Sequence, residues 1–339
     1  MELSTIWFVL IAVLWIGYFC LEGFDFGVGM LLPVLARSDR ERRTMINTIG
    51  PVWDGNEVWV LTAGGATFAA FPEWYATLFS GFYLPLLLIL LGLIVRGLAF
   101  EYRHQRPAAA WRARWDLALF VGSVLPAFLW GVAFANIVRG VPIDADKEFT
   151  GNLLTLLNPF ALLGGLVTLL LFLTHGAMFL ALKTDGDLRH RAGHLSVRVG
   201  VAAAVAAVAF LVWTQVIAGD AASAVLFVVA ALALVGGLVA AMGGREGWAF
   251  TGTFVTIAVA VAGLFVALFP DVMPSSTSAE FSLTTTNASA TDYTLTLMTW
   301  VAVILTPIVL LYQGWTYWVF RRRIAVHHIP EPEVGAAAP

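Results

Sequence analysis

Four carboxylate side chains lie within stretches of sequence that are otherwise almost entirely apolar. Glu22 and Asp25 are three residues apart, and Asp54 and Glu57 repeat that spacing. Residues three apart share one face of a helix, so each pair would present two carboxylates side by side. Ionisable residues inside membrane spans are costly and commonly mark proton or ion pathways. The spacing therefore indicates groups that could take up protons and pass them on.

Two further ionisable residues, Arg96 and His175, lie in other apolar stretches. At a rise of about 1.5 Å per residue, all six side chains fall in one layer, within about 10 Å of the same ends of their predicted helices. One interpretation is a proton uptake path of carboxylates and bound water. A second is a static network of salt bridges, and a third is a ligand site. One arginine cannot neutralise four carboxylates, so some must be protonated, hydrated or paired with another chain.

The six histidines limit the haem chemistry that this chain could support. Only His175 lies in an apolar stretch, so the chain cannot supply two histidine ligands to one haem inside the membrane. A haem with His175 as its single ligand and a histidine that is hydrogen-bonded between helices both remain open. The sole cysteine, Cys20, excludes an intrachain disulfide and a cysteine-based metal site, and we interpret it as a small buried apolar residue.

The elements that must position these residues follow from a strongly apolar composition. Of the 339 residues, 60% are hydrophobic and 12% are charged, whereas soluble domains carry about 25% charged residues. The mean hydropathy is +0.84. Apolar segments of about 20 residues predict transmembrane helices, and the alternating pattern of β-barrel strands is not found. We predict an all-α integral membrane protein whose first apolar run is a true span, not a cleaved signal peptide.

Nine apolar segments are long enough to span a membrane. They cover residues 6–32, 53–71, 76–100, 116–138, 157–182, 198–218, 222–242, 249–269 and 294–320. Loops on alternate sides carry 16 of the 19 lysine and arginine residues, and the positive-inside rule assigns them to the cytoplasm. The N-terminus is then outside and the C-terminus cytoplasmic, which requires an odd number of spans. Tryptophan and tyrosine residues near span ends, Tyr317 among them, are typical of interfacial belts.

The spans form one predicted membrane domain, residues 1–323. An Ala/Pro-rich cytoplasmic tail follows, residues 324–339, which we expect to be disordered. A weak internal repeat favours two four-helix bundles plus one extra helix, because segment 39–43 after the first span is similar to segment 187–191 after the fifth. The two segments could also have become similar independently, because the positive-inside rule favours basic residues in both cytoplasmic loops.

Several motifs resemble subunit II of cytochrome bd-type quinol oxidases. The most specific lies in residues 51–59, where the polar run WDGNEVW falls inside a predicted span. The segment 22–30 resembles the start of that subunit. Further similar segments are 41–47, 62–65, 79–83, 96–103, 174–177 and 312–315. The resemblance extends over nearly the whole chain and is weakest over residues 200–290.

The resemblance implies a nine-span subunit that forms a heterodimer with subunit I in the bacterial plasma membrane. In that family, subunit I carries haem b, haem d and the quinol site, and the complex oxidises quinol and reduces dioxygen to water with protons taken from the cytoplasm. The resemblance implies no catalytic haem in this chain. We expect no nucleic-acid partner. Some relatives hold a quinone or lipid in this subunit. The motifs decide neither that point, nor the quinol type, nor the presence of small accessory subunits.

Site residues are implied by motif position. Asp25 and Asp54 match the acidic residues that are associated with proton uptake in the family, and Arg96 matches a basic residue of the same layer. Trp59 lies near an oxygen access route in some members. The predicted proton pathway comprises Glu22, Asp25, Asp54, Glu57 and His175, with Arg96 as the charge partner.

Two other functions fit a polytopic chain with buried carboxylates. A proton-coupled secondary transporter would show paired, broken helices near the midplane, but Pro85, Pro126 and Pro307 show no matched pairing. An inert scaffold for a haem subunit would tolerate Asp54→Asn. The composition and motifs together favour the oxidase subunit.

Overall fold

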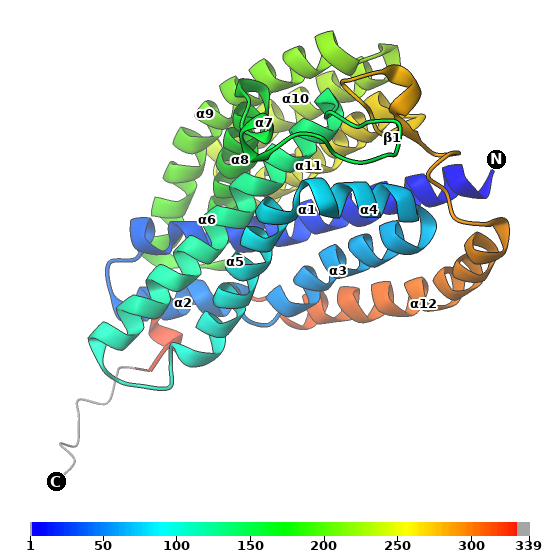
Figure 1. Ribbon diagram of the computed structural model, residues 1–339. Coiled ribbons are helices and arrows are strands. Elements are labelled where there is room, and N and C mark those ends of the chain that lie inside the picture. The colour runs from blue at the N-terminus through cyan, green and yellow to red at the C-terminus, as the bar shows by residue number, and fades with distance from the viewer. Residues whose placement is uncertain (1, 331–339) are drawn as a thin grey trace.

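The computed structural model describes residues 2–330, and within them it contains twelve α-helices and a short two-stranded sheet. Most helices lie side by side in one elongated bundle (Figure 1). The long helices are α1 (Leu3–Leu35), α3 (Trp53–Ala70), α5 (Tyr83–Tyr102), α6 (Ala109–Arg139), α8 (Pro159–Lys183), α9 (Gly186–Ala218), α10 (Ala221–Met242), α11 (Glu246–Leu268) and α12 (Asp292–Val319). The shorter elements are α2 (Asp39–Ile49), α4 (Pro72–Gly81), α7 (Leu153–Leu156), β1 (Asp271–Met273), β2 (Leu283–Thr284) and the 3-10 helices η1 (Ala279–Phe281) and η2 (Val326–His328).

Eight helices of residues 2–330 are long and apolar enough to cross a membrane, one fewer than the sequence predicted. They are α1, α5, α6, α8, α9, α10, α11 and α12. The remaining predicted span, 53–71, is α3, an 18-residue helix. Its first turns contain Asp54, Asn56 and Glu57, which lower its hydropathy, so composition does not identify it as a span. The all-α membrane fold is confirmed, whereas the count of nine spans is not.

Helix boundaries differ most from prediction in two places. The predicted span 76–100 is divided into α4 and α5, which are separated at Phe82. α9 begins at Gly186, well before the predicted start at residue 198, and Asp185 caps it by accepting a hydrogen bond from the Gly186 N–H. The polar first turns of α9 therefore extend the helix beyond its apolar part.

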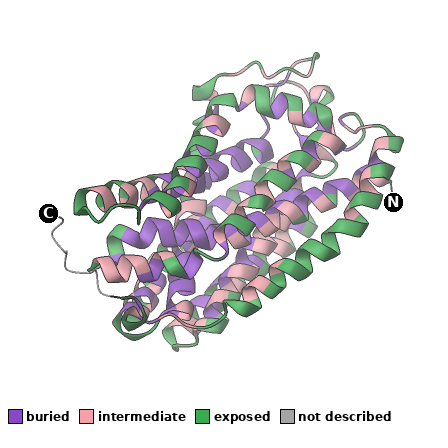
Figure 2. Cartoon of the chain, turned by 90° about the horizontal axis from the view of Figure 1, so that it is seen from below, coloured by how far each residue is buried: buried purple, intermediate pink, exposed green. Residues whose placement is uncertain are grey.

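α1 is the central helix of the fold. It packs against α3, α6, α8 and α11. Gly27 allows α8 to approach its backbone, because a Cβ atom at this position would lie 2.1 Å from the Phe172 carbonyl oxygen and 2.7 Å from Gly176 Cα. Small residues permit such close contact between membrane helices. Figure 2 shows buried residues concentrated in the interior helices and exposed residues on the outer ones.

α12 lies at the edge of the bundle. Its main contacts are with α1 and α3, and Leu295 is the one buried residue along its length. Near its start, Trp7 Nε1 donates a hydrogen bond to Thr299 Oγ1 at 3.1 Å. Because the rest of this apolar helix is so little covered, it must face lipid or another protein chain.

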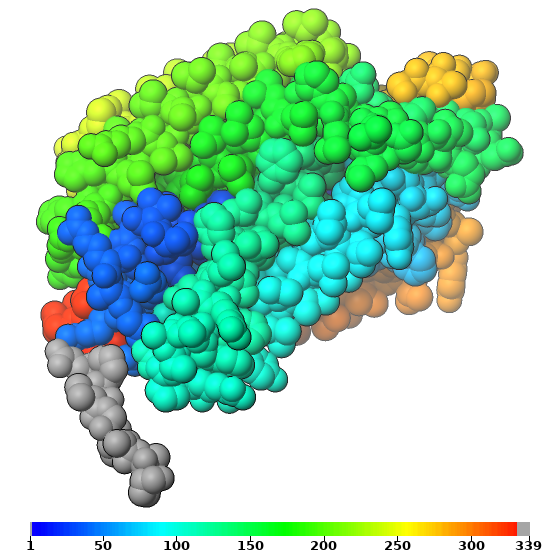
Figure 3. Space-filling view, turned by 60° about the vertical axis from the view of Figure 1, so that its left-hand side comes forward, coloured from blue at the N-terminus to red at the C-terminus, as the bar shows by residue number. Residues whose placement is uncertain are grey.

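The connecting segments gather at the two ends of the molecule. Residues 36–52, 101–110 and 320–330 lie together at one end in Figure 3, and residues 270–290 lie at the other. Residues 324–328 were predicted to belong to a disordered tail but are ordered, because the Ile324 N–H donates to the Lys183 carbonyl at 2.8 Å and Val326–His328 form η2. Residues 331–339 of that tail lie outside the described part of the chain.

Ion pairs hold α2 against the ends of α5 and α6. Arg103 Nη2 lies 2.8 Å from Asp39 Oδ1, and Arg103 Nε lies 2.5 Å from Asp116 Oδ1. Arg112 Nη1 lies 2.9 Å from Asp39 Oδ2. Burial raises the pKa of Asp39, but the hydrogen bond and charge of Arg103, together with the charge of Arg112, hold that pKa below its ordinary value of 3.8.

Candidate functional site

A fully buried ion pair joins α5 to α1. Arg96 Nη1 donates to Glu22 Oε1, and neither side chain is exposed to solvent. The same nitrogen lies 3.6 Å from Glu57 Oε2 on α3. One guanidinium therefore serves two carboxylates from two helices. Because a charge buried in a membrane protein requires a close partner, this contact fixes the relative position of α1, α3 and α5.

A glycine on α6 makes room for the arginine. A Cβ atom at Gly122 would lie 2.8 Å from Arg96 Cβ, so a larger residue would push α5 away. Aromatic rings cover the guanidinium, with Arg96 Cζ 4.9 Å from the centre of the Phe26 ring and 5.5 Å from that of Phe100. Such faces attract cations, and they also keep the ion pair away from lipid.

Asp25 is held separately from the ion pair. Its Oδ2 atom accepts a hydrogen bond of 2.6 Å from Asn56 Nδ2, and both residues are fully buried. Asn56 Nδ2 also lies 3.4 Å from the Leu21 carbonyl oxygen. Asn56 thus connects α3 to two successive turns of α1, and it orients the Asp25 carboxylate.

α12 completes this polar layer from the outside. Asn56 Oδ1 accepts a hydrogen bond of 2.7 Å from the Tyr317 hydroxyl and one of 3.3 Å from Gln313 Nε2. Gln313 Oε1 in turn accepts from Trp59 Nε1 at 2.8 Å. Gln313 and Tyr317 are four residues apart and share one helix face. Tyr317 therefore has a specific partner in addition to its place near a helix end.

Some polar atoms of the layer have no hydrogen-bond partner among residues 2–330. They are Glu22 Oε2, Asp25 Oδ1, Glu57 Oε2, Arg96 Nε and Arg96 Nη2. Nearly all buried polar atoms in proteins are hydrogen-bonded, and leaving one without a partner costs about 1–3 kcal/mol. These atoms are therefore suited to hold a proton or to bind a small polar molecule such as water.

The structure does not bring all four predicted carboxylates together. Glu22, Asp25 and Glu57 lie around Arg96 and Asn56, whereas Asp54 is exposed in the first turn of α3. It lies on the outward face of that helix, where the exposed side chains of Val58, Leu61 and Phe68 continue the same stripe. An exposed carboxylate beside apolar residues at this depth points to a surface that another chain covers.

His175 lies apart from the carboxylates. Its Nδ1 is 2.7 Å from Thr253 Oγ1 and its Nε2 is 3.1 Å from the Cys20 carbonyl oxygen. Its ring stacks on Phe250 at 4.5 Å. Both ring nitrogens are engaged between helices, which leaves neither free to bind a haem iron. The described residues likewise contain no group of three or more histidine, cysteine, aspartate or glutamate side chains that could hold a metal ion.

The Trp59 ring packs closely against α1, since a Cβ atom at Gly17 would lie 2.2 Å from two of the ring carbons. The contact ties α3 to α1 one turn away from Asn56.

Three contributors to the site were not identified from sequence: Asn56, Gln313 and Tyr317. A signal existed for each, because Asn56 lies between two carboxylates and Gln313 and Tyr317 are the polar residues at i, i+4 in the last apolar helix.

Comparisons with known proteins agree with one another. The family model described as cytochrome bd terminal oxidase subunit II matches residues 3–320. The chain is 43% identical to cytochrome bd ubiquinol oxidase subunit 2 of Bacillus subtilis over 329 residues, covering 96% of this chain and 97% of that protein. It is 40% identical over 370 aligned positions to cytochrome bd-I ubiquinol oxidase subunit 2 of Escherichia coli K12, covering 96% of each.

A solved structure has the same fold. The bd oxidase from Geobacillus thermodenitrificans contains a chain that aligns with a TM-score of 0.77 at 17% sequence identity. The alignment covers 94% of this chain and 99% of that one.

Proposed function

The chain belongs to the family of cytochrome bd terminal oxidase subunit II, and we propose that its own part in that complex is to carry protons through the buried carboxylate layer. It is a multi-pass protein of the bacterial plasma membrane. The relatives' names refer to ubiquinol oxidation. We infer that this chain, paired with subunit I, supports quinol oxidation and the reduction of dioxygen to water.

The haems b and d and the quinol site belong, in this proposal, to the partner subunit. Engagement of both His175 nitrogens supports this division, because no other histidine of residues 2–330 lies within a long apolar stretch. A haem would supply the electron transfer to dioxygen, and this chain would supply protons. A bound quinone or lipid in this chain and small accessory subunits remain predictions.

The outward faces of α3 and α12 are the proposed surface for subunit I. Leu61 is 68% exposed on α3 and Leu311 is 75% exposed on α12. Asp54 lies in the same α3 stripe, and an aspartate that faced lipid would be costly. A partner chain would cover the apolar residues and give Asp54 a polar or charged contact. The proton path would then start at the subunit interface.

Arg96 is the residue that makes several protonation states tolerable. Its Nη1 lies against both Glu22 and Glu57, so a proton on either carboxylate leaves the guanidinium paired with the other. The buried carboxylates Glu22 and Asp25, the partly buried Glu57 and one guanidinium cannot all be ionised at low cost. The layer is therefore expected to hold at least one exchangeable proton, which Asn56 and Tyr317 would keep in place by orienting Asp25.

The topology with nine spans and an external N-terminus is part of the same proposal. α3 would be the ninth span, because its 18 residues correspond to about 27 Å of helix, close to the thickness of a bilayer core. Its polar residues Asn56 and Glu57 face α1 and α5 and not lipid. α12 lies at the edge of the bundle, so it would be the extra helix in an arrangement of two four-helix bundles plus one.

The experiment that tests the function uses the complex purified with its partner. Asp25→Asn and Asp54→Asn are each expected to slow quinol-dependent oxygen uptake by about tenfold or more, as loss of a proton-transfer group does. The reduced-minus-oxidised haem spectrum should be unchanged. Normal oxygen uptake in both variants would contradict proton transfer, as the scaffold hypothesis requires, and loss of haem would assign these residues to assembly.

A further inference from the structure

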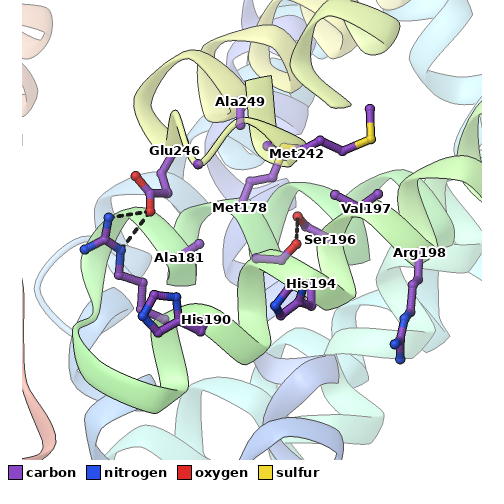
Figure 4. Close-up of a pocket in the computed structure, with 14 residues that line it drawn as sticks. Met178, Ala181, His190, His194, Ser196, Val197, Arg198, Met242, Glu246 and Ala249 are labelled. Atoms are coloured by element: carbon purple, nitrogen blue, oxygen red, sulfur yellow. Dashed lines mark hydrogen bonds and ion pairs between the residues drawn. The ribbon is translucent and has the colours of Figure 1, made fainter. Parts of the chain in front are cut away.

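A cavity of about 390 Å³ lies at the end of the molecule where α8, α9 and the α10–α11 turn meet. Its floor is apolar and buried, and includes Met178 and Ala249. One edge is basic. Figure 4 shows His190, His194 and Arg198 following one another along α9, with Met242 and Glu246 on the facing segment. None of these residues takes part in the carboxylate layer described above.

The charges of this cavity are not balanced within the chain. Arg189 is neutralised, since its Nη2 lies 2.6 Å from Glu246 Oε1. That contact also uses the only acidic side chain that lines the cavity. Within residues 2–330, no ion pair or side-chain hydrogen bond engages His190, His194 or Arg198. Other basic residues at this end do have acidic partners, as Arg103 and Arg191 show.

The basic edge continues into an apolar stripe on the same helix face. His190, His194 and Arg198 are spaced by four residues, so they lie one above the other on α9. Beyond Arg198, exposed valines continue this face toward the middle of the bundle. They are Val201, Val205, Val208 and Val212. The neighbouring helix α10 exposes Val235, Val239 and Met242 in parallel.

We propose that this cavity binds the phosphate headgroup of an anionic glycerophospholipid, with the acyl chains along the exposed valines of α9. Arg198 forms a charged hydrogen bond with the phosphate, and His190 and His194 donate to its remaining oxygens. The occupant must combine an anionic head with a long apolar part, because the cavity and the stripe are continuous. A soluble anion would satisfy only the basic edge.

The position in the fold agrees with this occupant. In Figure 1, α9 and α10 lie on the side of the bundle away from α3 and α12, so the proposed partner surface does not compete for the site. Basic residues near the membrane surface gain about 1 kcal/mol each from anionic lipid. The inference stands independently of the proton path.

The test uses the intact complex in nanodiscs of phosphatidylcholine that contain a small share of spin-labelled phosphatidylglycerol. The immobilised fraction of the label measures selectivity for the anionic lipid. Arg198→Gln is compared with Arg114→Gln, a matched control that removes an exposed arginine from the first turns of α6, away from the cavity. We expect Arg198→Gln to reduce selectivity about fivefold and Arg114→Gln to leave it unchanged.

Other results would overturn the proposal. Equal losses in the two variants would mean diffuse attraction to surface charge, and no loss in Arg198→Gln would mean that the cavity binds no headgroup. Displacement of the label by millimolar inorganic phosphate would identify a small-anion site instead of a lipid site. If Arg198→Gln does not assemble, His194→Gln tests the same edge, with oxygen uptake as the measure of an intact complex.

Discussion

Asn56 donates a hydrogen bond to Asp25 across the contact between α3 and α1, and the two atoms involved are 2.6 Å apart. No other hydrogen bond to Asp25 comes from the side chains of residues 2–330. The amide is itself held on its other side by the Tyr317 hydroxyl. The orientation of this carboxylate therefore depends on three helices that are distant in sequence.

The first prediction concerns this amide. Asn56→Leu should remove the donor to Asp25 and leave a buried carboxylate unsatisfied, at a cost of about 1–3 kcal/mol. We expect oxygen uptake by the complex to fall about tenfold while the haem spectrum is retained. Thr251→Val is the control, because Thr251 is exposed on α11, outside both the carboxylate layer and the proposed surface for subunit I. Unchanged oxygen uptake in Asn56→Leu would show that Asp25 needs no such positioning.

The second prediction concerns the anchor of α12. Tyr317→Phe removes one hydrogen bond to Asn56, and Gln313→Leu removes another together with the bond from Trp59, each worth about 0.6 kcal/mol between membrane helices. Because the two donors share one acceptor, the losses should not add in the double variant. Thermal unfolding of the purified complex measures this coupling. Strictly additive losses would indicate that α12 is held mainly by lipid or by the partner chain.

The third prediction concerns the buried ion pair. Arg96→Gln leaves Glu22 and Glu57 without their cation, and breaking a buried pair typically costs about 3–5 kcal/mol. We expect a large loss of complex yield and thermal stability. The double variant Arg96→Gln with Glu22→Gln removes both charges of the closer pair and should recover much of that loss. If the double variant is as unstable as the single one, charge balance is not what stabilises the layer.

The fourth prediction concerns pH. The pKa of Asp39 is held below 3.8 by Arg103 and Arg112, so its ion pairs stabilise the fold fully above that value. Their contribution is lost as pH falls through the lowered pKa. Asp39→Asn should therefore destabilise the protein at pH 7 and make progressively less difference as the pH is lowered below 3.8, as measured by thermal unfolding of the solubilised complex. The exposed acid Asp146 at the other end supplies the control Asp146→Asn, which should show no such difference.

The fifth prediction concerns the contact between α1 and α8. Gly27→Ala would force a methyl group against the backbone of Phe172 and Gly176, and overpacking of this kind commonly costs about 1–3 kcal/mol. Gly64→Ala is the matched control, because nothing lies within 4 Å of a Cβ atom there. We expect the first variant to lower the thermal unfolding temperature and the second to leave it unchanged. Equal tolerance would mean that α8 can move outward freely.

Most of the fold could be predicted from the apolar runs, because lipid demands long helices whose backbone groups are satisfied internally. The predicted span 53–71 does form a helix, α3, but Asp54, Asn56 and Glu57 lower its hydropathy, so it is not among the eight helices that qualify as spans by composition. Those same residues form part of the candidate site. The prediction of nine spans is therefore not confirmed at the helix where the chain departs from the rules for lipid-facing helices.

The site itself was only partly accessible from sequence. Depth along the helices correctly brought Glu22, Glu57 and Arg96 to one level, since the rise per residue is fixed. Rotation about each helix axis could not be predicted, because it depends on packing. For that reason the sequence wrongly places the side chains of Asp54 and His175 beside the other carboxylates. In the structure, Asp54 faces outward. His175 is enclosed by Thr253, Cys20 and Phe250.

The attachment of α12 also has a consequence for biosynthesis. Tyr317 follows Asn56 by 261 residues, which takes tens of seconds to synthesise at about 5–20 residues per second. During that interval the Asn56 oxygen lacks both of its donors, so the nascent chain has an incomplete polar layer. Insertion of α12 completes the polar layer, because Gln313 and Tyr317 then donate to Asn56. We expect chains truncated after residue 291 to be degraded faster in pulse-chase labelling than full-length chains, with the α12 anchor acting as a late checkpoint for quality control.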